Sequence, residues 1–180
     1  EKDLLKAQQL DSGLTDFAYF LGGIELAQGF DLKAIEYFEL SLKNNPKNFD
    51  AMLNKGRAYF SLEEYDKAAK NFDEAFQNSK DLQPNHVIER VQAHLLSGKA
   101  SPQEIADIIN AGLKRFGPIL NLQIELFNMY FSFKDYHNAL NSLDQIIENV
   151  NRKERWLIEK VRCYIALKDM DAAKAEMEKS

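Results

Sequence analysis

The sequence predicts an all-α fold, a solenoid of antiparallel helix hairpins, because the chain repeats itself at an interval of 34 residues. A period of this length is typical of stacked helical units, each of which buries its apolar face only against its neighbours. Within a unit, the apolar residues recur at three- and four-residue spacings, which places them on one helical face. The clearest recurring pairs are Gly22 and Gly56, Ala34 and Ala68, and Phe38 and Phe72.

The composition is that of a folded, soluble protein. Hydrophobic residues make up 45% of the 180 residues, which is ordinary for a globular chain. The net charge of −5 and the pI near 5.3 oppose nucleic-acid binding, which depends on clustered Lys and Arg. The apolar stretches are a few residues each, whereas a membrane span needs about 20. We therefore expect a soluble protein, cytoplasmic or periplasmic, that neither spans a membrane nor binds nucleic acid.

The two clearest hairpins occupy residues 15–48 and 49–82. In the second, a helix over residues 51–60 is followed by a polar break at 61–65 and then by another helix with the same apolar periodicity. Two antiparallel helices joined by a short turn follow from this pattern. In the first hairpin, Pro46 ends the second helix, because proline has no amide donor and clashes with the preceding turn.

These units resemble the tetratricopeptide repeat, whose pattern runs from a large residue through Leu-Gly, Tyr, Ala and Phe to a closing Pro. The resemblance implies a right-handed α-solenoid in which small residues let facing helices approach closely. It covers essentially the whole chain and is strongest in residues 15–79. The matching residues are Leu21, Gly22, Ala34, Phe38 and Pro46 in the first unit, and Gly56, Tyr59, Ala68, Phe72 and Ala75 in the second.

The third repeat, residues 84–118, is degenerate. Its interhelix loop at 97–102 is longer than its counterparts, and Ile105 and Gly112 replace the two small alanine-type residues. The run Ser101-Pro102-Gln103-Glu104 predicts a helix start with a capping box and proline in the first turn. We expect this repeat to be the most loosely packed.

The remaining repeats are less complete. Residues 120–152 form a fourth repeat, with Phe127 where glycine would sit, and residues 154–180 form a truncated fifth. Residues 1–12 have the spacing of the end of a preceding repeat. These ends suggest a segment of a longer solenoid, whose exposed apolar side chains favour self-association. The apolar residues concerned are Leu4, Leu5, Leu10 and Met177.

The sequence shows no pattern of an active site, a metal site or a cofactor site, so we do not expect an enzyme. His86, His94 and His137 lack metal-ligand spacing, and His94 aligns with tyrosines as a packing residue. Gly22-Gly23 lies within a predicted helix and lacks the Gly-Lys-Ser or Gly-Lys-Thr of a phosphate loop. The single cysteine, Cys163, is expected to fill a small buried position.

In tetratricopeptide repeat proteins the first helices of successive repeats line the concave face, where ligands usually lie. Carried over to this chain, the face has apolar, polar and apolar rows that suit an extended peptide or a partner helix. Its amides can pair with a ligand backbone, while Arg57 and Arg162 can hold a carboxylate. The alternative is that the apolar members only pack between helices and the polar members are solvated. The predicted groove residues are Tyr19, Gly23, Leu53, Asn54, Arg57, Phe60, Ile88, Gln92, Ile124, Asn128, Phe131, Ile158 and Arg162.

One subfamily holds the C-terminal carboxylate of chaperones with a clamp of lysine and asparagine. Here Tyr19 and Leu53 stand at the matching lysine positions and Gly23 at the first asparagine position, so that Asn54 alone fits. We therefore do not expect a chaperone-tail adaptor.

The predicted function is non-catalytic binding of another protein or peptide along the concave groove, as a scaffold or adaptor. Three alternatives remain open. They are a self-associating structural scaffold, the regulatory segment of a larger enzyme, and a component of a bacterial polysaccharide-export or secretion assembly.

Overall fold

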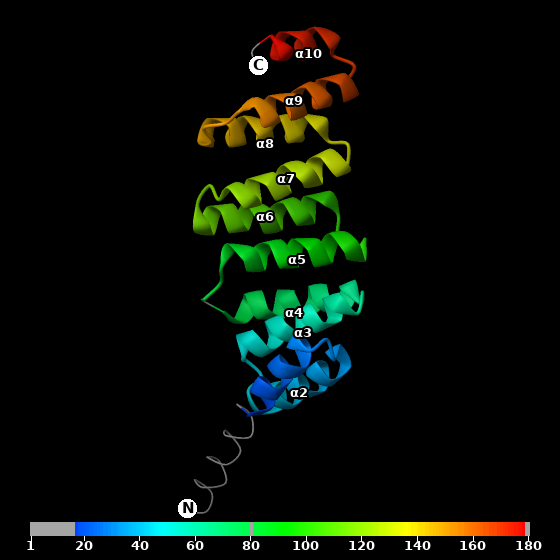
Figure 1. Cartoon of the computed structure of the whole chain (residues 1–180), viewed down its shortest axis with the longest axis vertical. Coiled ribbons are helices and arrows are strands. Elements are labelled where there is room, and N and C mark those ends of the chain that lie inside the picture. The colour runs from blue at the N-terminus through cyan, green and yellow to red at the C-terminus, as the bar shows by residue number, and fades with distance from the viewer. Residues whose placement is uncertain (1–16, 80, 179–180) are drawn as a thin grey trace, which may run out of the picture. The chain divides into compact units, whose positions relative to one another are not determined.

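The computed structural model describes residues 17–79 and 81–178, and this part of the chain consists of helices and the turns that connect them (Figure 1). The predicted repeat end at 1–12, with Leu4, Leu5 and Leu10, lies outside the described residues. Helical residues 17–27 come first. They are followed by α2 (Asp31–Asn44), α3 (Phe49–Ser61), α4 (Tyr65–Asn78), α5 (Pro84–Ser97), α6 (Pro102–Phe116), α7 (Leu120–Ser132), α8 (Tyr136–Asn149), α9 (Glu154–Ala166) and α10 (Met170–Met177).

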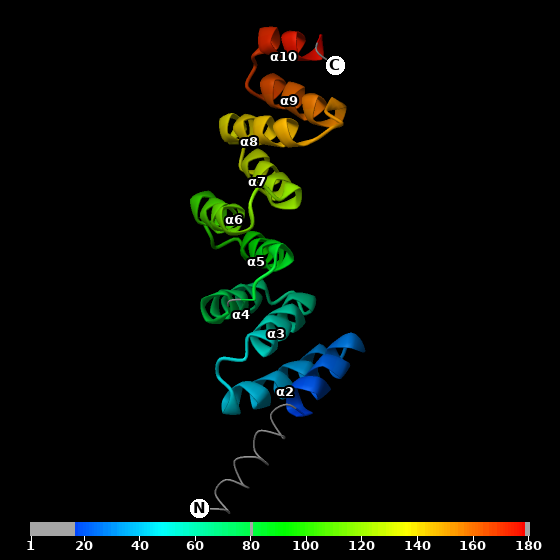
Figure 2. The same cartoon turned by 90° about the vertical axis from the view of Figure 1, so that its left-hand side faces the viewer.

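The chain divides into two compact units, unit 1 up to Lys99 and unit 2 from Ala100. Within each unit, helices that follow one another in the chain lie side by side (Figures 1 and 2). The main contacts join α2 to α3, α3 to α4 and α4 to α5 in unit 1, and successive pairs from α6 to α10 in unit 2. This confirms the predicted all-α stack of helix hairpins. The boundary falls in the loop at 97–102 that the sequence marks as unusually long.

A glycine on the first helix of each of the first two hairpins lies against an aromatic ring on the second. A Cβ atom built on Gly56 would lie 2.7 Å from Cε1 of Phe72, and one built on Gly22 would lie 2.7 Å from Cε1 of Phe38. Both rings are fully buried. The glycines are therefore required for close approach, which outweighs their cost of about 1 kcal/mol in a helix interior.

Gly56→Leu is expected to destabilise the protein by about 2 kcal/mol or more, because the new side chain would have to displace the Phe72 ring. The matched control is Gly23→Leu, since a Cβ at Gly23 meets no atom within 4 Å. Urea denaturation followed by circular dichroism measures both variants. Equal midpoints for the two variants would show that the Gly56 contact does not limit packing.

The first helix of every described hairpin is followed by one residue in the left-handed region. After four of these residues, the backbone N–H of the next residue donates to the carbonyl oxygen of the residue five positions before it, at 2.9 Å. This hydrogen bond is characteristic of a Schellman motif. The donor and acceptor pairs are Phe30 and Glu25, Glu64 and Tyr59, Asp135 and Tyr130, and Asp169 and Tyr164. The left-handed residues are Gly29 (φ +79°), Glu63 (+60°), Gly98 (+67°), Lys134 (+62°) and Lys168 (+63°).

Lys134→Gly is expected to stabilise the protein by about 0.5–1 kcal/mol, because glycine adopts positive φ without the steric cost that a Cβ imposes. Lys134→Ala is the control, since alanine removes the lysine side chain but keeps the Cβ. Urea unfolding midpoints give the comparison. If alanine stabilises as much as glycine, the gain does not come from the backbone.

An ion pair recurs where the second helix of one hairpin meets the first helix of the next. The acidic residue lies on the second helix. The basic residue lies on the first helix of the following hairpin, eight residues before the left-handed residue that comes after that helix. At the α6–α7 contact the corresponding positions hold Asn110 and Leu126, and Leu126 is buried instead. The pairs are Glu39 and Lys55 at 3.0 Å, Asp73 and Arg90 at 2.6 Å, and Asp144 and Lys160 at 2.7 Å.

The middle pair belongs to a small network between α4 and α5. One carboxylate oxygen of Asp73 accepts a hydrogen bond from Arg90 and lies 3.0 Å from Nε2 of His94. Burial alone would raise the pKa of Asp73, but the contacts with His94 and Arg90 outweigh it and hold the pKa below its ordinary value. The predicted packing residue His94 is therefore also a polar partner of α4.

Asp73→Asn is expected to destabilise the protein at pH 7 by about 1–2 kcal/mol. A carboxyl with a lowered native pKa contributes stability above its unfolded pKa and loses it as the pH falls through the native pKa. The difference from wild type should therefore shrink below about pH 4. Urea unfolding at pH 7 and pH 3 measures this.

The control for this prediction is Asp66→Asn, on the same helix, because Asp66 is 51% exposed and makes only an exposed pair with Lys99. Its effect at pH 7 should be under half that of Asp73→Asn. An Asp73→Asn effect that is the same at both pH values would contradict the lowered pKa.

Two local predictions are confirmed. Ser101 and Glu104 form the capping box at the start of α6, with the Ser101 amide donating to Glu104 Oε2 at 2.8 Å and the Glu104 amide donating to Ser101 Oγ at 3.3 Å. Cys163 is fully buried in a cluster with residues of α8. Burial raises the pKa of its thiol to about 11, so the group is unreactive at neutral pH.

Candidate functional site

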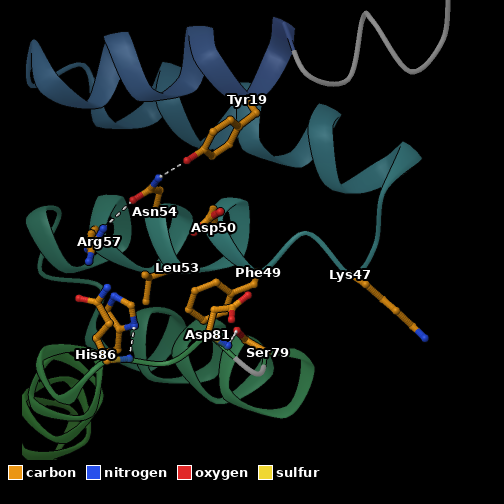
Figure 3. A pocket seen from close by; sticks show the side chains of 11 residues that line it. Tyr19, Lys47, Phe49, Asp50, Leu53, Asn54, Arg57, Ser79, Asp81 and His86 are labelled. Carbon is orange, nitrogen blue, oxygen red and sulfur yellow. Dashed lines mark hydrogen bonds between the residues drawn. The ribbon is translucent and has the colours of Figure 1, made fainter. Parts of the chain in front are cut away.

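An open pocket with a volume of about 720 Å³ lies in unit 1, between the first helices of successive hairpins (Figure 3). Its walls are formed by residues of the first described helix, of the start and middle of α3, of the connection after α4 and of the start of α5. The lining residues are Tyr19, Lys47, Phe49, Asp50, Leu53, Asn54, Arg57, Ser79, Asp81, Gln83 and His86.

A chain of hydrogen bonds crosses the three first helices of unit 1 beside this pocket. Nδ2 of Asn54 donates to the hydroxyl oxygen of Tyr19 at 3.4 Å, and Nη1 of Arg57 donates to Oδ1 of Asn54 at 2.8 Å. Nη2 and Nε of Arg57 donate to the two carboxylate oxygens of Glu89 at distances from 2.9 to 3.2 Å. These polar side chains therefore connect the three helices, although Glu89 does not belong to the predicted groove.

The position of Arg57 differs from its predicted role. The sequence suggests that Arg57 holds a carboxylate of the ligand, but in the structure the chain's own Glu89 takes this place. A bidentate guanidinium–carboxylate pair uses the donors that a second carboxylate would need. Glu89 is not among the predicted groove residues. It neutralises the guanidinium of Arg57, which the prediction assigned to a ligand carboxylate.

His86 forms one wall of the pocket as a neutral imidazole. Its Nδ1 accepts a hydrogen bond from the backbone N–H of Gln83 at 3.2 Å, which assigns the ring proton to Nε2. Burial lowers the pKa of His86 below its ordinary value and outweighs the nearby carboxylates of Glu89 and Asp50. The ring packs at a tilt against Phe49, with a centroid distance of 5.5 Å. The wall is therefore aromatic and carries one N–H donor.

Tyr19 supplies a second donor. Burial, together with the charge of Asp50, raises the pKa of its hydroxyl above the ordinary value. The protonated hydroxyl accepts from Asn54 and keeps its own proton to donate. Asp50 and Asp81 are exposed at the pocket, whereas Lys47 extends away from the other labelled side chains in Figure 3.

Four predicted groove residues line this pocket: Tyr19, Leu53, Asn54 and Arg57. Leu53 is only 3% exposed and belongs to the core cluster of α3 and α4, so it forms the base of the pocket. The prediction missed the lining residues at the start of α3 and between α4 and α5, because it followed helical rows only. The Pro84 start of α5 is the signal that could have placed the preceding connection and His86 at this surface.

The other predicted residues of unit 1 lie outside this pocket. A side chain at Gly23 would face open space, and Gln92 is exposed. Ile88 is half-buried, and Phe60 packs edge-on against Tyr65 at 5.2 Å. These residues stay predictions as ligand contacts.

In unit 2 the predicted groove residues are partly free and partly engaged. Asn128 is exposed, and Ile158 is 59% exposed. Arg162 pairs with Glu159 at 2.8 Å and lies 5.1 Å above the ring of Phe131. Ile124 and Phe131 pack against the core cluster of this unit. Arg162, like Arg57, is thus paired with an acid of the chain itself.

The described residues lack the features of two other classes of site. No group of three or more His, Cys, Asp or Glu side chains there is arranged to hold a metal ion. In the same residues, no helix has both the length and the apolar character that crossing a bilayer requires.

Stacked helix hairpins with a polar, aromatic pocket between successive first helices define the class of helical repeat proteins that act as interaction scaffolds. Residues 25–81 match the tetratricopeptide repeat family, and the helix hairpins that follow this segment have the same architecture. This segment belongs to the tetratricopeptide repeat family.

Solved structures show the same fold. A crystal structure of MamA has 15% sequence identity and a TM-score of 0.75, and the match covers 92% of this chain and 89% of that one. MamA from Desulfovibrio magneticus RS-1 has 11% identity and a TM-score of 0.72, with 92% of both chains covered. YrrB, described as a tetratricopeptide repeat protein with an unusual peptide-binding site, has 10% identity and a TM-score of 0.70, with 90% of this chain and 82% of that one covered. A comparison with curated protein sequences gives no match.

Proposed function

We propose that this protein is a non-catalytic scaffold that binds another polypeptide on the first-helix faces of its hairpins, with the unit 1 pocket as the main contact. The pocket between successive first helices carries the proposal. Its volume of about 720 Å³ lies within the range of ligand sites, about 300–1,000 Å³. The described peptide-binding site of YrrB, which has the same fold, supports a polypeptide ligand.

The chemistry of these faces suits a peptide or a partner helix. The Tyr19 hydroxyl and Nε2–H of His86 are donors for carbonyl oxygens of a peptide backbone. In unit 1 the exposed amide of Gln92, and in unit 2 the exposed amide of Asn128, can each pair with a backbone group. Exposed Ile158 offers an apolar contact in unit 2. Unit 1 and unit 2 act as separate binding faces.

Gln92→Ala and Asn128→Ala are each expected to weaken partner binding by about 1–3 kcal/mol, because each removes polar pairing with the ligand. Both side chains are exposed, so the free energy of unfolding of each variant should stay within about 0.5 kcal/mol of that of wild type. The measurement is a quantitative pull-down from the lysate of the source organism, read by mass spectrometry with wild type, each variant and the double variant.

The matched controls are Gln77→Ala on α4 and Asn141→Ala on α8, which remove the same amide groups from exposed positions on second helices. They should retain the partners of the wild type. If the double variant retains those partners and the controls lose them, the ligand lies on the second-helix face and the proposal is wrong.

A further inference from the structure

We infer that the unit 1 pocket receives a basic side chain of the partner, an arginine guanidinium or a lysine ammonium. This inference rests on the proposed function and gives the ligand of that site a definite charge. It opposes the sequence-based expectation that Arg57 holds a ligand carboxylate.

The charges at the pocket favour a cation. The guanidinium of Arg57 is bound by both carboxylate oxygens of Glu89 and by Asn54, so its charge is already balanced. Lys47 extends away from the other lining side chains (Figure 3). Two carboxylates, Asp50 and Asp81, then remain exposed at the pocket, and neither forms an ion pair with another of its lining residues.

The aromatic groups fit the same ligand. Figure 3 shows Asp81 beside Phe49, whose ring packs against His86, and Asp50 on the Asn54 side of α3. A cation over an aromatic face gains further attraction, and arginine pairs with carboxylates bidentately. Because His86 is neutral, it adds no positive charge that would repel this side chain. An acidic side chain would instead meet two carboxylates, which is unfavourable.

The remaining donors suit the chain that carries the basic residue. Nε2–H of His86 and the Tyr19 hydroxyl can donate to backbone carbonyls beside the bound side chain. The net charge of −5 for the whole chain also speeds the approach of a basic segment at low salt. Charge, aromatic surface and hydrogen-bond donors therefore agree on one ligand class.

The test uses the full chain and a phage-displayed library of random 12-residue peptides as the probe. Selected peptides are synthesised, their affinity is measured by fluorescence anisotropy, and their site is mapped by amide chemical shifts. We expect enrichment of Arg or Lys at one peptide position and shifts at residues 49–57 and 81–86. The double variant Asp50→Asn, Asp81→Asn should weaken binding at least about 10-fold, and 0.5 M salt should weaken wild-type binding similarly.

Glu36→Gln is the control, because Glu36 is an exposed acid on α2 that does not line the pocket, and it should keep the wild-type affinity. An equal urea midpoint for the double variant shows that the loss is not unfolding. Asp81→Lys provides a second readout, since it should shift preference toward peptides in which Glu replaces the basic residue.

The outcomes separate this inference from the proposed function. Peptides without a basic residue that shift residues 49–57 and 81–86, and bind the double variant as tightly as wild type, would overturn the basic-ligand inference and leave the groove proposal standing. Selection of no peptide that shifts these residues would contradict both.

Discussion

The contact between a glycine on a first helix and an aromatic ring on the second decides the geometry of the first two hairpins. At Gly56 one added carbon would come within 2.7 Å of Phe72, so no side chain fits there without displacing a buried ring. A hairpin closed this tightly fixes the rotation of α3 about its axis. Asn54 and Arg57 then face the neighbouring first helices, and the polar row beside the pocket depends on a core contact made elsewhere on the same helix.

The internal pairing of Arg57 explains why charge at the pocket cannot be inferred from the lining residues alone. Arg57 lines the pocket, but Glu89, on the next first helix, neutralises it. A half-exposed pair of this kind contributes modestly to stability, yet it determines which charges are left for a ligand. Arg162 and Glu159 repeat the arrangement within one helix of unit 2. In both units the arginines that sequence reasoning assigns to a ligand are used by the chain.

The fold was largely predictable because the hairpin pattern is local and repeated. The Gly56 and Phe72 pair, the capping box at Ser101 and the buried Cys163 all follow from spacing along one or two helices. The partner of Arg57 was not predictable, since Glu89 is 32 residues away and its contact depends on side-chain conformations across two helices. The left-handed conformation of Lys134 and Lys168 was also missed, because neither residue type indicates positive φ. The aligned turns of the first two hairpins show it only after the structure is known.

The recurring acid and base at the hairpin contacts make the repeats of this chain unequal as modules. Lys160 is 12% exposed on its side chain and relies on Asp144 of the preceding helix. If the hairpin that begins with α9 were transplanted behind α6, its lysine would meet Asn110 and be left with one acid fewer at a desolvated position. The contacts between neighbouring repeats therefore depend on the order of the repeats, although their backbones are alike.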